Sequence, residues 1–154
     1  MKKKITIIRH AQSKFNAGQF KDDSELLNCP LSDFGKMQAK SLNQTFDVII
    51  ISTLKRAMET YLNSCIKADN VIESHLFREQ RETSILNFLE GEEIIPETPD
   101  DVRKRAREAI EYLKTLNYEN IGIISHAYFI WYFLEQIGQR PGIIYNTQAI
   151  TFEL

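Results

Sequence analysis

Three short, largely apolar runs stand out along the chain, at residues 5–8, 48–51 and 121–124. None of them shows the regular alternation of apolar and polar side chains that marks a strand with one exposed face. Such runs are typical of strands that are buried on both faces of a parallel sheet. A last segment, residues 148–154, alternates Ile150, Phe152 and Leu154 with polar residues. It predicts a further strand nearer the edge of the sheet.

The segments between these runs have helical spacing. Apolar side chains recur at three- and four-residue steps on one predicted face, at Leu54, Ala57, Met58, Tyr61, Leu62 and Cys65. A second helix is expected over residues 98–116, because Thr98 suits an N-cap, Pro99 suits the first helical position, and two aspartates follow. Further helices are expected from Ser32 through Leu42 and over residues 127–135, the latter ending near Gly138. The alternation of strands and helices predicts an α/β fold with a mostly parallel central sheet.

Composition narrows the class of protein. The 154 residues, 43% of them apolar, suit a single domain spanning residues 1–154. A formal net charge of −2 gives no general attraction to nucleic acid or to an anionic membrane, so we expect neither partner. No apolar stretch approaches the length that crosses a bilayer, and the chain has only two cysteines, Cys29 and Cys65. These features predict a cytoplasmic protein.

Chemically capable side chains follow directly after each apolar run. Arg9 and His10 follow the first, Ser52, Thr53 and Arg56 the second, and Ser125 and His126 the third. In open α/β sheets, ligands bind beyond the carboxyl ends of the strands, so these residues are expected to converge. Arginine matches phosphate oxygens with a planar fork of donors, and imidazole can act as a nucleophile or carry a proton. The sequence therefore predicts a site for a doubly charged anion such as a phosphoryl group.

Four ordered blocks of sequence resemble one known family. They are Arg9-His10-Ala11 with Gln12, Ser13 and Asn16; Pro30-Leu31-Ser32-Asp33-Phe34-Gly35 with Gln38-Ala39; Ser52-Thr53-Leu54-Lys55-Arg56-Ala57-Met58-Glu59-Thr60; and Ser125-His126-Ala127. In this order they resemble the histidine phosphatase, or phosphoglycerate-mutase-like, superfamily, of which this chain would be a compact member. Ala11 and Ala127 stand where the family usually has glycine. The resemblance implies a three-layer sandwich with helices on both faces of the central sheet.

The resemblance also implies a set of roles. His10 would attack phosphorus and become phosphorylated, while Arg9, Arg56 and His126 would hold the phosphoryl oxygens. Glu79, in Phe77-Arg78-Glu79, is the best match to the catalytic acid, with Glu82 as the alternative. Two further positions, Asn16 and Ser13, would bind the phosphoryl group. The family needs no metal or cofactor, and we expect none.

Structural alternatives remain for several of these residues. His10 and His126 could be ordinary core histidines, and Arg9 and Arg56 could pair with carboxylates such as Glu59. His75 lacks a matching context and is interpreted as structural. A basic cluster at Arg103, Lys104, Arg105 and Arg107 is interpreted as a solvated helix face. The aromatic run Tyr128, Phe129, Trp131, Tyr132 and Phe133 is interpreted mainly as core packing.

The favoured function is hydrolysis of the phosphate monoester of a small metabolite. Alternatives are a phosphohistidine or phosphoprotein phosphatase, a phosphoglycerate-type mutase, and a non-catalytic phosphate-binding domain. Only about forty residues separate Glu79 from the third strand run, and one predicted helix fills much of that interval, which leaves little chain for a lid. The determinants of specificity are expected in residues 15–27 and 84–97.

Overall fold

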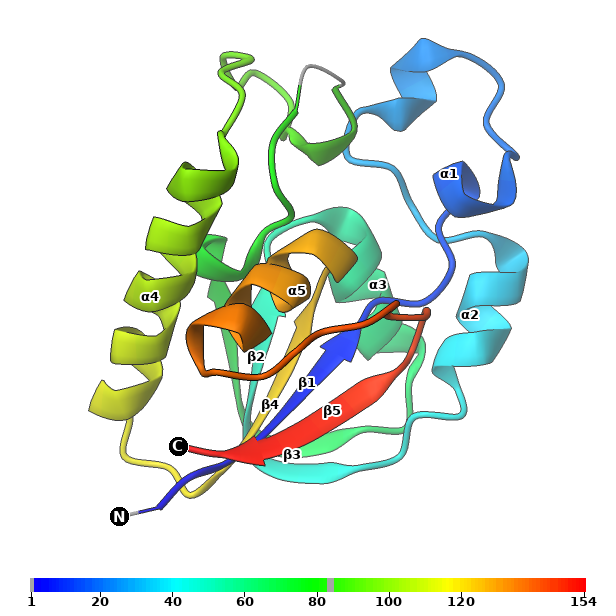
Figure 1. Ribbon diagram of the computed structural model, residues 1–154. Coiled ribbons are helices and arrows are strands. Elements are labelled where there is room, and N and C mark those ends of the chain that lie inside the picture. Colours follow the sequence, from blue (N-terminus) through cyan, green and yellow to red (C-terminus); the bar gives the residue numbers. More distant parts are fainter. Residues whose placement is uncertain (1, 83–84) are drawn as a thin grey trace.

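A five-stranded sheet forms the centre of the computed structural model, which describes residues 2–82 and 85–154. In chain order the strands are β1 (Lys4–Arg9), β2 (Thr45–Ser52), β3 (Lys67–Ser74), β4 (Asn120–Ser125) and β5 (Ala149–Glu153). Their order across the sheet is β3-β2-β4-β1-β5. The first four are parallel, and β5 pairs antiparallel with β1 at one edge (Figure 1). The predicted parallel sheet and edge strand are confirmed.

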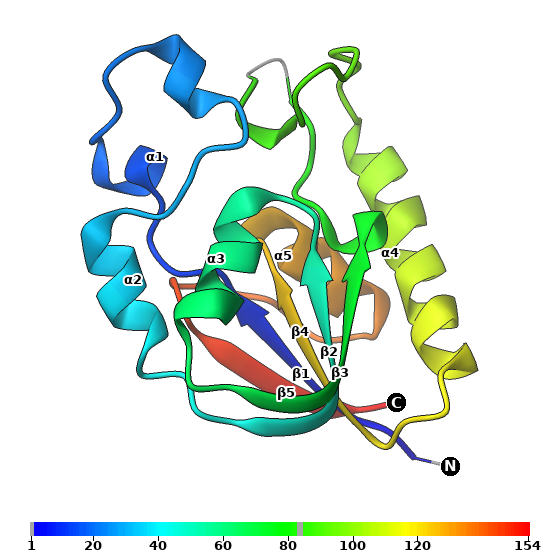
Figure 2. The ribbon, with the colours of Figure 1, turned by 180° about the vertical axis from the view of Figure 1, so that it is seen from behind.

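Helices cover both faces of this sheet. The α-helices are α1 (Lys14–Ala17), α2 (Asp33–Ala39), α3 (Lys55–Asn63), α4 (Pro99–Thr115) and α5 (Ala127–Gln136). Short 3-10 turns occupy Asp23–Leu26, His75–Phe77 and Ile85–Asn87. Helices α4 and α5 lie on one face, and α3, with α2 beside it, lies on the other (Figure 2). This three-layer α/β arrangement is the fold that the sequence predicts.

The strands bury side chains on both faces. Ile5 and Ile7 of β1 pack into the cluster formed with α4 and α5, whereas Ile8 packs into the cluster that contains Ala57 of α3. Full burial of one such side chain contributes about 1.5–3 kcal/mol to stability. The apolar runs therefore lack alternation because each face of the sheet has its own helical layer.

Some predicted elements differ from the structure. Strand β3 is not predicted, because most of its residues are exposed or half-buried and polar, so it has no continuous apolar run. The spacing predicts Leu62 on the buried face of its helix, but its side chain is 69% exposed, and Thr60 is buried instead. The helix that begins after Ser32 ends at Ala39 and does not extend to Leu42. By contrast, Thr98 caps α4 with Pro99 in its first turn, as predicted.

No helix in the described ranges is both long and apolar enough to span a membrane.

Candidate active site

The carboxyl ends of three neighbouring strands meet at one end of the molecule. Arg9 ends β1, Ser52 ends β2 and Ser125 ends β4, and Arg9 and Ser125 are direct partners in the parallel register. A cavity of about 570 Å³ opens there. Its lining includes six of the residues expected at the site: Arg9, His10, Ser13, Asn16, Arg56 and Glu79. These residues converge at the strand ends, whereas His126, which is also expected at the site, is not among the residues that line the cavity.

His10 is held in one orientation at this cavity. Its side chain is buried, and Nδ1 lies 2.5 Å from the carbonyl oxygen of Ala11. A carbonyl oxygen only accepts, so Nδ1 carries the hydrogen and the lone pair is on Nε2. Burial, and secondarily the charge of Arg56, keep the pKa of His10 well below its usual range. His10 is therefore a neutral imidazole whose Nε2 is available as a nucleophile.

His126 lies directly behind His10, fully buried, with the two ring centroids 5.1 Å apart. Its Nε2 lies 2.7 Å from the hydroxyl oxygen of Ser52. Within the described part of the chain, its Nδ1 is buried without a hydrogen-bond partner. Burial, followed by the nearby charge of Arg56, holds the pKa of His126 well below that of free imidazole. His126 thus lies next to His10 with one unpartnered ring nitrogen, but its side chain is not part of the cavity lining.

Two arginines provide the positive charge. Arg56 is buried, and its Nη2 donates to Oδ1 of Asn87 at 2.5 Å. Burial lowers the pKa of Arg56 to about 10, so the guanidinium stays charged at neutral pH. Arg9 donates from Nη1 to the carbonyl oxygen of Ile144 at 2.7 Å, and its Nε has no partner among the described residues. Both guanidiniums keep donors that an anion can use.

Glu79 is anchored at the start of α5. Its carboxylate accepts hydrogen bonds from the backbone amides of Tyr128 at 3.0 Å and Phe129 at 2.8 Å. Burial raises the pKa of Glu79, although these amides and the charge of Arg56 oppose the increase. Glu82 also lines the cavity, but it is exposed. Of the two candidate acids, Glu79 is the one that is buried and held by backbone hydrogen bonds at the cavity.

Ser13 and Asn16 cap the short helix α1 reciprocally. The amide of Asn16 donates to Oγ of Ser13 at 3.1 Å, and the amide of Ser13 donates to Oδ1 of Asn16 at 3.0 Å. Both residues line the cavity. Because Oδ1 of Asn16 is occupied, its Nδ2 group is the part of this side chain that is free to donate to a ligand.

Comparison with known sequences assigns the family. Residues 5–88, more than half of the chain, match the histidine phosphatase superfamily (branch 1). The chain belongs to the histidine phosphatase superfamily. No curated protein sequence matches it.

Solved structures support the fold of this superfamily member. "Mycobacterial hydrolase 1" superposes with a TM-score of 0.73 at 16% identity, covering 99% of this chain and 92% of that one. A phosphoserine phosphatase from Entamoeba histolytica gives 0.70 at 20% identity, covering 97% and 90%. A putative α-ribazole-5'-P phosphatase from Escherichia coli gives 0.71 at 18% identity, covering 90% and 81%. At these identities the likeness establishes the fold alone.

Several superfamily motif residues lie outside the cavity lining and fix the loop that carries His10. Thr60 accepts a hydrogen bond from the amide of Ala11 at 2.9 Å. Gln38 accepts one from the amide of Gln12 at 3.0 Å. These contacts join α2 and α3 to the residues directly after β1. The spacing of the motif blocks therefore reflects the support of the nucleophile loop as well as the chemistry.

Glu59 supports the segment that leads into α2, and Gly35 of α2 lies against the loop that carries His10. Glu59 accepts from the amide of Leu31 at 2.9 Å, and the hydrogen bonds found for Arg9 and Arg56 go to other partners. The alternative that Glu59 pairs with these arginines is wrong. A Cβ atom on Gly35 would lie 2.0 Å from the carbonyl oxygen of Gln12. Only glycine lets α2 approach the nucleophile loop this closely.

Two structural interpretations need correction. Arg105 is not on a solvated face, since it forms ion pairs with Glu97 and donates to three backbone carbonyl oxygens, including that of Glu79 at 3.4 Å. In the aromatic run, Phe129 and Phe133 are core residues, but Tyr128 and Trp131 line the cavity. A pattern with helical spacing does not show which end of a helix borders a cavity.

Other cavity residues were missed by sequence analysis. The side chain of Asn87 accepts a hydrogen bond from Arg56, and the carbonyl oxygen of Ile144 accepts one from Arg9. Asn87 lies in the segment 84–97 that is predicted to determine specificity. No signal in the sequence connects the side chain of Asn87 to Arg56. Ser84 of the same segment is outside the described residues. The segment 142–144, which also lines the cavity, was not predicted at all. His75 is exposed and pairs with Thr53, away from the cavity lining, in keeping with its structural interpretation.

Proposed function

We propose that this protein hydrolyses a phosphate monoester of a small metabolite through a phosphohistidine formed on His10. The observation that carries the proposal is the orientation of His10, whose Nδ1–H is committed to Ala11 while Nε2 keeps its lone pair. The same cavity contains Arg9, Arg56 and Glu79. A neutral imidazole beside two guanidiniums is suited to attack a dianionic phosphoryl group.

In the first step, Nε2 of His10 attacks phosphorus while the bond from phosphorus to the ester oxygen breaks. Arg9 and Arg56 neutralise charge on the phosphoryl oxygens. His126 supplies another donor from Nδ1 when the hydroxyl of Ser52 donates to its Nε2. Protonated Glu79 gives its proton to the leaving oxygen, so the alcohol departs neutral.

In the second step, water attacks the phosphohistidine. Ionised Glu79 takes a proton from this water, the N–P bond breaks, and inorganic phosphate leaves with His10 restored. The raised pKa of Glu79 supports both roles, because the carboxyl group can be protonated for the first step and deprotonated for the second. Glu82 remains the alternative acid. The unpaired thiols of Cys29 and Cys65 suit the cytoplasm, which we propose as the setting.

The test is a rapid-quench experiment with ³²P-labelled phosphate monoesters, phosphoserine and a phosphohistidine peptide. We expect transient, acid-labile label on the protein followed by release of inorganic phosphate. His10→Asn should show neither, whereas His75→Asn, which changes an exposed histidine outside the cavity lining, should behave as wild type.

Three other outcomes would each reject the proposal. Label that passes from the protein to a second metabolite would indicate a mutase. Turnover of the phosphohistidine peptide alone would indicate a phosphoprotein phosphatase. Saturable binding of phosphate esters without label or turnover would indicate a phosphate-binding domain.

A further inference from the structure

The lining of the cavity has a polar part and an apolar part. The groups proposed to hold and transfer the phosphoryl group are polar, while most of the remaining lining is apolar. This apolar part comes from four separate segments of the chain: Phe15 of α1, Leu86, Tyr128 and Trp131 of α5, and Ile143 and Ile144. We call these six side chains the apolar wall.

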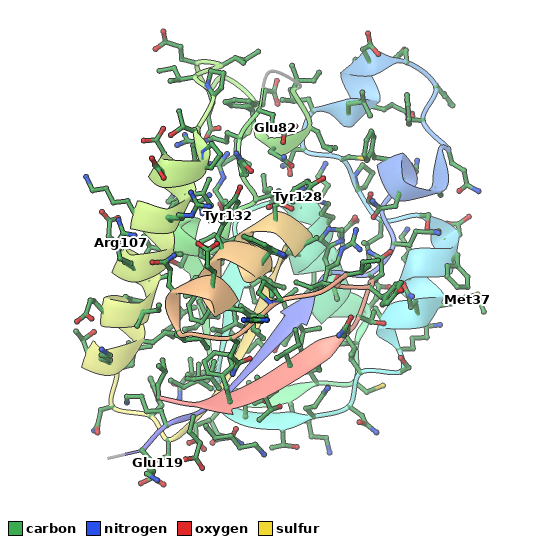
Figure 3. All side chains as sticks on the ribbon, in the orientation of Figure 1. Met37, Glu82, Arg107, Glu119, Tyr128 and Tyr132 are labelled. Carbon is green, nitrogen blue, oxygen red and sulfur yellow. The ribbon has the colours of Figure 1, made fainter. Side chains whose placement is uncertain are left out.

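Part of the apolar wall is exposed at the mouth of the site. Ile143 is 76% exposed, Tyr128 is 59% exposed and Phe15 is 43% exposed. Tyr128 and Glu82 both lie toward the end of the molecule where the parallel strands finish (Figure 3). Apolar side chains grouped around a concave site mark a surface that binds an apolar group.

The charged residues of the cavity lining are unfavourable for a second acidic group on the substrate. Among the described residues of the lining, the only cations are Arg9 and Arg56, and the proposed mechanism uses both for the phosphoryl group. The remaining charged residue outside the catalytic set is Glu82, a carboxylate. Nearby Arg78 and Arg81 form ion pairs with Glu92 and Glu97 and do not line the cavity. A carboxylate or second phosphate on the substrate would meet apolar surface and Glu82.

We infer that the leaving group of the substrate is an uncharged, aromatic or otherwise apolar alcohol, bound against the apolar wall. The inference rests on the proposed phosphatase function and specifies its substrate class. Tyr128 and Trp131 provide ring surfaces at the start of α5, and Ile143 and Phe15 provide further apolar area. In the described part of the lining a second anion finds no partner, and this determines specificity as much as the apolar contact does.

The first test compares phenyl phosphate with 4-carboxyphenyl phosphate, which differ by one carboxylate, using the purified full-length chain. We expect kcat/KM for phenyl phosphate to be higher by roughly tenfold or more, because the charged ring loses hydration without gaining a partner. Ile143→Lys should reduce this ratio and raise kcat/KM for the carboxylated ester. Leu62→Lys adds the same charge at an exposed position of α3 and should leave the ratio unchanged.

A second test measures ligand binding in the absence of turnover. Trp131 is the only tryptophan of the chain, so its fluorescence reports on the apolar wall directly. Phenylphosphonate, which cannot be hydrolysed at phosphorus under these conditions, should change the emission of wild-type protein and of His10→Asn. Inorganic phosphate should change it much less, and 4-carboxyphenylphosphonate should bind more weakly than phenylphosphonate.

The outcomes separate this inference from the proposed function. If His10 is labelled but the carboxylated ester is hydrolysed as well as the neutral one, the apolar subsite is refuted and the phosphatase stands. If no ester labels His10 while phenylphosphonate still changes the fluorescence of Trp131, the phosphatase is refuted, and with it the assignment of the bound group as a leaving group.

Discussion

The two proposed proton-handling side chains have opposite requirements. His10 must be unprotonated at Nε2 to attack phosphorus, whereas Glu79 must be protonated to release the alcohol. Burial shifts the pKa of each group toward the protonation state that the reaction needs, since it lowers the pKa of His10 and raises the pKa of Glu79. The same loss of hydration thus favours the reactive form of a base and of an acid, because it penalises the charged form of each.

This arrangement predicts the pH dependence of turnover. The acid limb of kcat/KM should follow His10 and lie below pH 6.5, the usual imidazole value, and the alkaline limb should follow Glu79 and lie above its usual value of about 4.5. Glu79→Gln should remove the alkaline limb and lower kcat for alkyl phosphates by about 10²–10⁴. Steady-state kinetics over the range of pH provides the measurement.

The leaving group provides the control for this prediction. p-Nitrophenolate departs without a proton, so Glu79→Gln should lower kcat/KM, which reports the first step, much less for p-nitrophenyl phosphate than for an alkyl phosphate. Glu82→Gln, which changes the alternative acid, should keep the alkaline limb for the alkyl phosphate. The assignment to Glu79 is wrong if the two variants exchange these behaviours.

Among the structural elements, α2 and α3 position the nucleophile loop without entering the proposed chemistry. Helix α2 approaches the loop through Gly35, at whose Cα there is no space for a methyl group next to Gln12. Helix α3 reaches the same loop through Thr60. The geometry of His10 therefore depends on packing between elements that lie 20 to 50 residues away in sequence.

Gly35→Ala tests this dependence. In an ordinary helix this change stabilises by up to about 1 kcal/mol. Here the new methyl group would overlap the carbonyl oxygen of Gln12, so we expect destabilisation of about 1–3 kcal/mol, as for overpacked sites. Turnover should fall as well, because the loop after β1 must shift. Urea unfolding and kcat should be measured together on the folded variant.

Gly142→Ala is the matched control for stability, because a Cβ atom there would have no neighbour within 4 Å. Its free energy of unfolding should change by less than about 0.5 kcal/mol. Equal stability of the two variants would show that α2 can move away from the loop without cost.

The sequence predicts those elements that are buried and whose signals lie within their own short stretch of residues. Strands β1, β2 and β4 follow from largely apolar runs, and α4 follows from its cap at Thr98. Strand β3 has no such signal, because it lies at the edge of the sheet and exposes polar side chains. Arg9, His10 and His126 are predictable because each lies at the end of a strand or directly after it. Asn87 and Ile144 act through contacts that exist only after folding.

For the whole molecule, the net charge is no guide to the charges at the proposed site. The chain carries a formal charge of −2, yet Arg9 and Arg56 place two positive charges there, beside the carboxyl groups of Glu79 and Glu82. Long-range attraction therefore adds little to the capture of a phosphate ester, and the buried guanidiniums must supply it at short range. Because His10 and His126 are buried, and lie close to these cations, protonation of either histidine has a cost in free energy.

This cost should be visible in the stability of the whole protein. The pKa values of His10 and His126 are lower in the folded state than the unfolded value of about 6.5, so the unfolded chain binds more protons below that pH. The free energy of unfolding should then be fully maintained above pH 6.5 and fall as the pH drops from there toward the folded pKa values. Urea unfolding at about pH 7.5 and 5.5, in phosphate-free buffer, measures the fall.

The double variant His10→Asn/His126→Asn should show a smaller decrease over the same interval, whatever its absolute stability. Glu79 acts in the opposite direction, because its raised pKa makes the folded state gain protons first as the pH falls. It is retained in the variant, so the difference between the two proteins reports mainly on the histidines. His75→Asn changes an exposed imidazole and should keep the wild-type decrease. A double variant with an undiminished decrease would show that some other group causes the acid sensitivity.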